Sequence, residues 1–201
     1  MAYTSFPGPD ETLFDLAWLH PEIYRSFEHG VFEAKTHFET KQIKYDGAAF
    51  STFVRLHAKD YLSKRGLEAI DVEDVNLTGL SLRLDRYHIK MWKASEDGLP
   101  IPGKSEPKQA FYQQPLFTDG DSPEVLNLAV IWNTDASKNL SSIWLVCPKS
   151  GDEKSAEAHW NVRIPDPALA VQSSNSNPPT DDLPMVLKNT EDTKKKGNQR
   201  E

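Results

Sequence analysis

The chain has 201 residues, of which 38% are hydrophobic, and it carries a formal net charge of −7. Nucleic-acid-binding proteins usually have a surplus of basic residues, so a nucleic-acid partner is possible but not favoured. No stretch reaches the roughly 18 apolar residues that a membrane-spanning helix requires, and an acidic chain is not attracted to an anionic membrane. We therefore expect no membrane partner.

The cysteine content and the N-terminus indicate the compartment. Cys147 is the single cysteine, so no intramolecular disulfide can form. The first residues lack the charged and apolar regions of a secretory signal peptide. A lone thiol without such a signal is typical of the reducing cytosol, and the sequence therefore predicts a cytoplasmic protein.

Three helices are predicted in the first third of the chain. Asp10 can cap a short helix that carries Leu13 to Trp18. A second helix is predicted over residues 21–41, with apolar residues at steps of three and four: Ile23, Phe27, Val31, Ala34 and Phe38. Gly30 within it suggests a close approach by a neighbouring element, and Phe32 points away from its apolar arc. A third helix is predicted over residues 48–64, ending at Gly66.

From Val72 onward the hydrophobic period changes to two, which indicates strands. Leu80 to Asp85 and Tyr87 to Trp92 alternate with opposite parity. The change around Asp85-Arg86 indicates a tight turn or a β-bulge, and the bulge is favoured because neither glycine nor asparagine is present. Further strands are predicted over residues 109–117, 125–132, 140–147 and 159–164. The second and third of these form a hairpin across the polar bridge 133–139.

Helices followed by strands predict an α+β fold. We expect two to three N-terminal helices packed on one face of an antiparallel sheet of about five strands, in a single domain over residues 1–165. Residues 166–201 are polar and poor in apolar side chains. Such a segment cannot bury enough apolar surface to offset its ordering entropy, so a disordered C-terminal tail is predicted.

Two sets of histidines could carry chemistry in the helical region. His29, Glu33 and His37 share one flank of the second helix, a spacing that could bind a transition metal. That flank faces away from the apolar arc, however, so a solvated polar face is the preferred interpretation. His57 lies on the apolar face of the third helix and is interpreted as a core histidine. No metal site and no cofactor are predicted.

The segment Arg83 to Lys93 is the most distinctive local pattern. Its basic side chains alternate with aromatic ones, which would suit a phosphate or a stacked base. If the last strand lies beside it, His88 and His159 could exchange protons, and a phosphate could be held by Arg83, Arg86, Lys90 and Arg163. The simpler interpretation is a solvated strand face whose charges prevent aggregation.

The favoured function is a cytosolic protein-interaction module, because no recognisable catalytic motif is present. Aromatic side chains commonly anchor interfaces, and the expected partner-binding residues are Phe32, Trp92, Phe111 and Tyr112. The alternative is a metal-independent phosphodiesterase or RNase that uses the basic, histidine-containing sheet face. A third hypothesis is a small-ligand carrier with a pocket around His57 and Trp144. A shared cleft holding His88, His159 and Arg163 would favour the enzyme, and their dispersal would favour the interaction module.

Overall fold

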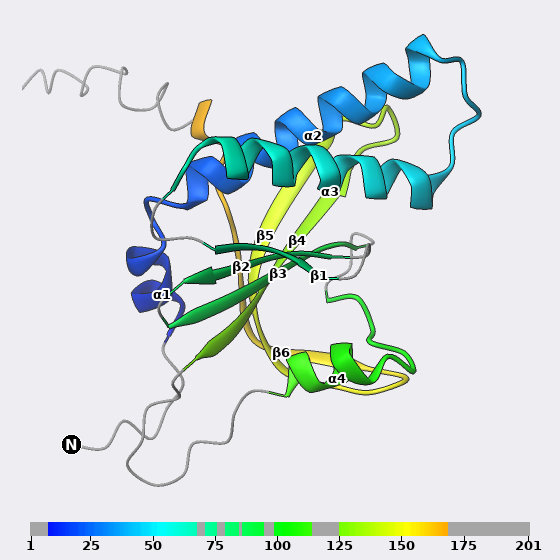
Figure 1. Ribbon diagram of the computed structural model, residues 1–201. Helices are drawn as coiled ribbons and strands as arrows, with labels where there is room; N and C mark the ends of the chain where they lie inside the picture. The colour runs from blue at the N-terminus through cyan, green and yellow to red at the C-terminus, as the bar shows by residue number, and fades with distance from the viewer. Residues whose placement is uncertain are drawn as a thin grey trace, which may run out of the picture.

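The computed structural model describes residues 8–67, 71–75, 79–84, 86–94, 99–113 and 125–168. These residues form an α+β fold with four helices and a six-stranded sheet (Figure 1), so the predicted fold class is confirmed. The helices are α1 (Pro9–Asp15), α2 (His20–Thr40), α3 (Gly47–Lys64) and α4 (Glu106–Tyr112). The strands are β1 (Asp71–Val75), β2 (Gly79–Leu84), β3 (Tyr87–Lys93), β4 (Leu126–Thr134), β5 (Leu140–Gly151) and β6 (Ala156–Arg163).

Local signals explain where the two long helices begin and end. Pro21 lies in the first turn of α2, where its missing N–H removes no intrahelical bond. The Asp46 carboxylate caps α3 by accepting a hydrogen bond from the Ala49 amide at 2.7 Å. Gly66 adopts φ +58° just after α3, a conformation that glycine reaches without strain. The predicted bounds of both helices are therefore correct to within one or two residues.

The sheet order is β1-β2-β3-β4-β5-β6. Every neighbouring pair is antiparallel except β3 and β4, which run parallel with Tyr87 opposite Leu126. Parallel neighbours cannot be joined by a hairpin, so the chain must cross over between them, and α4 lies on that crossover. The sheet is thus mostly antiparallel, as expected, with one parallel pair that the sequence did not predict.

The prediction of a strand over residues 109–117 is wrong for residues 109–113, the part that the structure describes. Residues 109–112 belong to α4. Pro107 stands in the first turn of that helix, where its fixed φ suits a helix start, and the acidic Glu106 favours the same end. The adjacent aromatics Phe111 and Tyr112 favour a strand on propensity, but in the structure they end a short helix and pack against the sheet.

The β-bulge favoured near Asp85-Arg86 is also wrong. Leu84 pairs directly with Tyr87 in an antiparallel ladder, so only two residues join β2 to β3. The change of parity is the consequence of this tight hairpin. Because directly opposed residues share a face, Leu82 and Ile89 lie opposite each other and both point into the core.

The main core lies between one face of the sheet and the helices α1, α2 and α3. Trp132 of β4 is fully buried there and stacks on Phe27 of α2, with ring centroids 5.4 Å apart. Where α2 crosses α3, a Cβ on Gly30 would come within 2.5 Å of the Val54 carbonyl oxygen. The close approach expected at Gly30 is therefore confirmed. The three N-terminal helices share this sheet face, as predicted.

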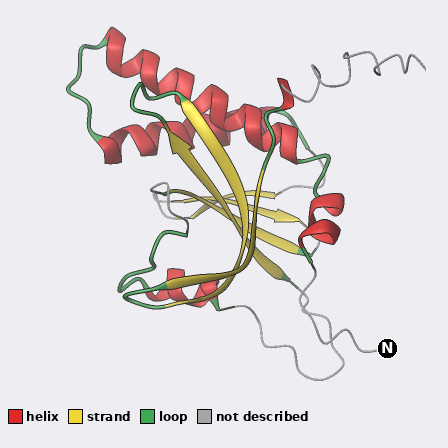
Figure 2. Ribbon diagram, turned by 180° about the vertical axis from the view of Figure 1, so that it is seen from behind, coloured by secondary structure: helices red, strands yellow, loops and turns green. Residues whose placement is uncertain are grey.

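A second, smaller apolar cluster occupies the opposite face of the sheet. Ala129, Ile131 and Val146 are its buried members. Figure 2 shows the α2–α3 pair at one end of the long strands and α4 at the other. Since α4 packs on the face that the N-terminal helices leave open, helices cover parts of both faces.

The predicted disordered tail falls almost wholly outside the described residues. The structure describes the chain as far as Ala168, and residues 169–201 lie beyond it. The division into a domain over residues 1–165 and a tail over residues 166–201 stays a prediction.

Candidate functional site

The two histidines proposed as an acid–base pair lie on different parts of the sheet. His88 is on β3 and His159 is on β6, with β4 and β5 between them. Neighbouring strands are about 4.8 Å apart, so three strand steps separate the two side chains by roughly 14 Å. Partial burial, followed by the nearby Lys149 ammonium, lowers the pKa of the His159 imidazole. The geometry does not bring the two imidazoles within reach of one proton.

The arginines predicted to hold a phosphate are also dispersed. Arg86 faces α1, where its guanidinium contacts Glu11 at 3.1 Å and Asp15 at 3.7 Å. Arg163 lies on β6 and donates to the Ser141 carbonyl oxygen at 3.1 Å. Arg83 alone lies directly opposite His88, on β2. Arg86 therefore links the sheet to α1, and the four predicted ligands do not converge.

His88 itself has a defined setting beneath α4. Its Nε2 lies 2.9 Å from the Ser81 hydroxyl oxygen, and its ring meets the Phe111 ring edge to face at 5.2 Å. Lys90 places its ammonium 4.7 Å from the centre of the same Phe111 ring. Ser81 is buried, with 1% of its surface exposed, whereas His88 is half-buried, so the Ser81 hydroxyl is shielded from solvent.

Three of the predicted partner-binding residues form one packed group, here called the α4 cluster: Trp92, Phe111 and Tyr112. Trp92 contacts Phe111 at 5.2 Å and Tyr112 at 5.7 Å between ring centroids. Phe111 and Tyr112 are buried, and the Tyr112 hydroxyl donates to the Pro100 carbonyl oxygen at 2.6 Å. Burial raises the pKa of this phenol. The α4 cluster thus attaches α4 to the sheet.

The histidine flank of α2 lies along α3 and is half-buried, so it is less solvated than the sequence suggests. His29 contacts His57 at 6.4 Å and Tyr61 at 5.6 Å, while His37 stacks on Phe53 at 4.5 Å. The flank is partly covered because α3 packs alongside α2. Among the residues that the structure describes, no group of three or more His, Cys, Asp or Glu side chains could hold a metal ion.

His57 and Trp144 do not share a pocket. His57 belongs to the outer seam between α2 and α3, where it also stacks near Phe53. Trp144 packs on the second apolar cluster, across the sheet from the main core. The two side chains lie on opposite sides of the sheet, which removes the basis for the ligand-carrier hypothesis.

Among the predicted partner-binding residues, Phe32 is the exposed one, with 63% of its surface accessible. It lies in a groove of about 400 Å³ between α2 and the tip of the β4–β5 hairpin, here called the α2 groove. Its lining residues come mostly from α2: Tyr24, Glu28, Val31, Phe32, Lys35, Thr36, Glu39, Asn139, Leu140 and Asp166. The expectation that Phe32 points away from the helix's apolar arc is confirmed.

Hydrogen bonds fix the two walls of the α2 groove relative to each other. The Lys35 ammonium donates to Asn139 Oδ1 at 3.1 Å across the groove. Asn139 is itself held by Asp135, whose carboxylate accepts from the Asn139 amide at 2.8 Å. The backbone N–H of Asn139, followed by its side-chain amide and the Ser137 backbone N–H, lowers the pKa of the Asp135 carboxyl. The hairpin tip is therefore an ordered wall.

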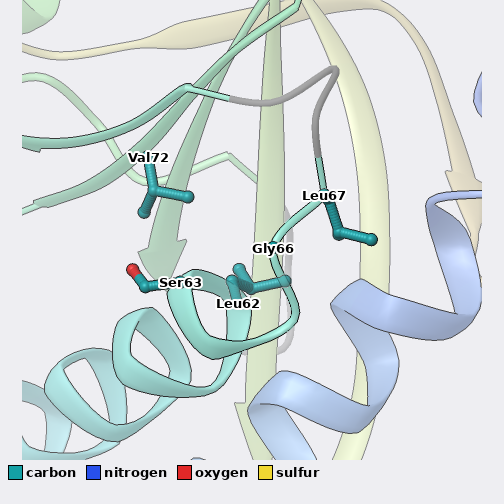
Figure 3. Close-up of a pocket in the computed structure, with 5 residues that line it drawn as sticks. All are labelled: Leu62, Ser63, Gly66, Leu67 and Val72. Carbon is teal, nitrogen blue, oxygen red and sulfur yellow. The ribbon is translucent and has the colours of Figure 1, made fainter.

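A second hollow lies at the C-terminal end of α3. It has a volume of about 270 Å³ and is lined by Leu62, Ser63, Gly66, Leu67 and Val72 (Figure 3). Of these five side chains only Ser63 carries a polar atom, a hydroxyl at the rim. None of the described residues that line this hollow has a titratable side chain.

The single thiol is not a candidate nucleophile. Cys147 is fully buried in the main core. Burial raises its pKa to about 12, so the reactive thiolate is not formed near neutral pH. Cys147 therefore contributes to packing and not to reactivity.

Comparisons of the chain with protein-family models, with curated proteins and with solved structures give no match. None of the helices that the structure describes is long and apolar enough to cross a lipid bilayer.

Proposed function

We propose that this protein is an interaction module that binds a segment of a protein partner in the α2 groove, with Phe32 as the central contact. We propose a cytoplasmic location as well, in keeping with a single thiol that is buried in the core.

The observation that carries the proposal is the exposure of Phe32 beside a groove with an ordered opposite wall. An isolated exposed aromatic is common on protein surfaces and means little alone. Phe32 differs because the partly exposed Leu140 provides apolar surface within the same groove. An aromatic at the centre of such a site, surrounded by groups that exclude water, is typical of an interface anchor.

The dispersal of the proposed catalytic residues also favours the interaction module over a phosphodiesterase or RNase. A general acid and a general base must both reach the reacting atoms. His88 and His159 are separated by two strands, and Arg86 is engaged by α1. The enzyme would need a different set of residues from the one that the sequence pattern favours.

The test is a selection of peptides from a random display library on the full-length protein. We expect enrichment of peptides with a shared apolar residue, and we expect Phe32→Ala to weaken their binding about 30-fold, since central anchors contribute about 2 kcal/mol or more. Phe14→Ala is the matched control, because Phe14 is 83% exposed and lies on α1, outside the groove.

Both variants should unfold at the temperature of the unmodified protein, because neither side chain is buried. If the library yields no enriched sequence, or if the enriched peptides bind Phe32→Ala as well as the unmodified protein, the proposal is wrong. Loss of binding in Phe14→Ala alone would assign the interface to α1.

A further inference from the structure

We infer that the partner segment of the α2 groove presents one apolar side chain flanked on both sides by lysine or arginine. This inference rests on the proposed function and adds the chemistry of the partner to it. Its basis is the order of charges along the exposed face of α2.

Glu28, Phe32 and Glu39 line the same groove from the same helix. Glu28 precedes Phe32 by four residues and Glu39 follows it by seven, which are whole numbers of helical turns to a close approximation. At about 1.5 Å of rise per residue, the two carboxylates lie roughly 6 Å and 10 Å from the aromatic ring along the helix axis. The exposed face of α2 is therefore an apolar centre between two acids.

Of the described residues that line the groove, Lys35 alone is cationic, and it forms no ion pair with Glu28 or Glu39. Lys35 reaches across to Asn139 at 3.1 Å, and its charge lies close enough to Asp135 to lower the pKa of that carboxyl. Within the described ranges, neither Glu28 nor Glu39 takes part in an ion pair, in contrast to Glu22 of the same helix, which Arg65 binds at 2.9 Å. Asp166, the third carboxylate of the groove, adds to the negative charge.

Asp166 affects the pKa of a neighbouring phenol, that of Tyr24. Burial, followed by the nearby Asp166 carboxylate, raises the pKa of Tyr24 to about 12. Glu28 acts on the same phenol in the same direction. Asp166 and Glu28 therefore place negative charge near the Tyr24 phenol, and the Arg163 guanidinium offsets part of it.

This pattern selects a partner by charge and holds it by apolar contact. Exposed ion pairs contribute little individually, so the apolar anchor supplies most of the affinity. Complementary charges mainly raise the association rate and exclude wrong partners. A segment with acidic flanks would meet like charges at both ends of the groove, and so would nucleic acid.

The experiment titrates the full-length protein with three synthetic peptides that share one apolar anchor and differ only in their flanks. The flanks carry Lys, Gln or Glu, and binding is followed by fluorescence anisotropy at low and at physiological salt. We expect the Lys peptide to bind best and the Glu peptide worst, with the difference shrinking as salt screens the exposed charges.

The double variant Glu28→Gln with Glu39→Gln should weaken the Lys peptide about three- to tenfold and leave the Gln peptide unchanged, because two exposed ion pairs are lost. Glu153→Gln, in the exposed turn between β5 and β6, is the matched control and should change neither. Phe32→Ala should weaken the binding of all three peptides about 30-fold.

The outcomes separate this inference from the proposed function. Equal binding of the three peptides, weakened by Phe32→Ala, would keep the groove as a binding site and overturn the basic partner. Failure of every peptide, or binding that Phe32→Ala leaves unchanged, would overturn the proposed function itself. Concentration-dependent self-association abolished by Phe32→Ala would make a second copy of the chain the occupant, which contradicts a basic segment.

Discussion

Aromatic residues have different surroundings in the α4 cluster and in the α2 groove. Phe111 and Tyr112 are 4% and 0% exposed, and the Tyr112 hydroxyl has an acceptor within the chain. Phe32 is 63% exposed and faces an ordered wall across a groove. The aromatic rings of the first region are already packed, whereas the ring of the second still has apolar surface to bury. Aromatic content alone therefore does not identify an interface.

Truncation of the α4 cluster should give the largest loss of stability. Tyr112→Ala removes a fully buried ring and leaves a cavity, so the free energy of unfolding should fall by about 3–5 kcal/mol. Tyr112→Phe keeps the ring and removes one hydrogen bond, which should cost about 1 kcal/mol. Urea denaturation of both variants measures the difference. Equal stability of Tyr112→Ala and the unmodified protein would contradict a structural role for the cluster.

The buried face of α2, opposite Phe32, provides a second comparison, in which Gly30 is tested against Gly47. Gly30→Ala places a methyl group against the Val54 carbonyl oxygen, a backbone atom that cannot move aside. We expect it to lower the free energy of unfolding by about 1–3 kcal/mol through overpacking, although alanine favours a helix. Gly47→Ala at the start of α3 meets no atom within 4 Å and should be neutral or slightly stabilising. Thermal unfolding of both variants is the measurement, and equal stability of Gly30→Ala and Gly47→Ala would contradict the close crossing of α2 and α3.

The floor of the α2 groove should respond to alkaline pH. The pKa of Tyr24 is raised from 10.0 to about 12 by burial first and by Asp166 second. Above pH 10 the phenol therefore ionises more readily in the unfolded chain, so its stabilising contribution is complete below pH 10 and declines between pH 10 and about 12.

Tyr24→Phe removes this dependence, and the variant should lose less stability than the unmodified protein over that interval. Chemical denaturation at pH 8 and pH 11 is the measurement. Identical losses in the two proteins would mean that Tyr24 is not shielded from solvent as described. Tyr87 and Tyr112 also have raised pKa values, so part of the alkaline dependence should remain in the variant.

Much of the fold could be predicted because its elements are long and periodic. Apolar residues at steps of three and four predict α2, which has 21 residues. Two apolar runs around a polar bridge predict the β4–β5 hairpin. The seven residues of α4 are too few for a clear helical period. Adjacent aromatics there favour a strand, and the local helix signals are limited to Glu106 and Pro107 in the first turn.

The candidate site was predictable only in part, for a different physical reason. The phase of Phe32 on its helix follows from sequence spacing, so its exposure could be anticipated. The separation of His88 from His159 depends on strand order, and local patterns do not encode which strands are neighbours. The groove also needs Asn139 and Leu140, more than 100 residues from Phe32, and no local pattern connects those positions.

The most direct test of the account is the affinity of one selected peptide for three proteins: the unmodified chain, Phe32→Ala and Phe14→Ala. Isothermal titration calorimetry should show about a 30-fold loss for Phe32→Ala and no change for Phe14→Ala, with the unfolding temperature of all three the same. Equal affinities for Phe32→Ala and the unmodified chain would contradict the assignment of the α2 groove as the binding surface.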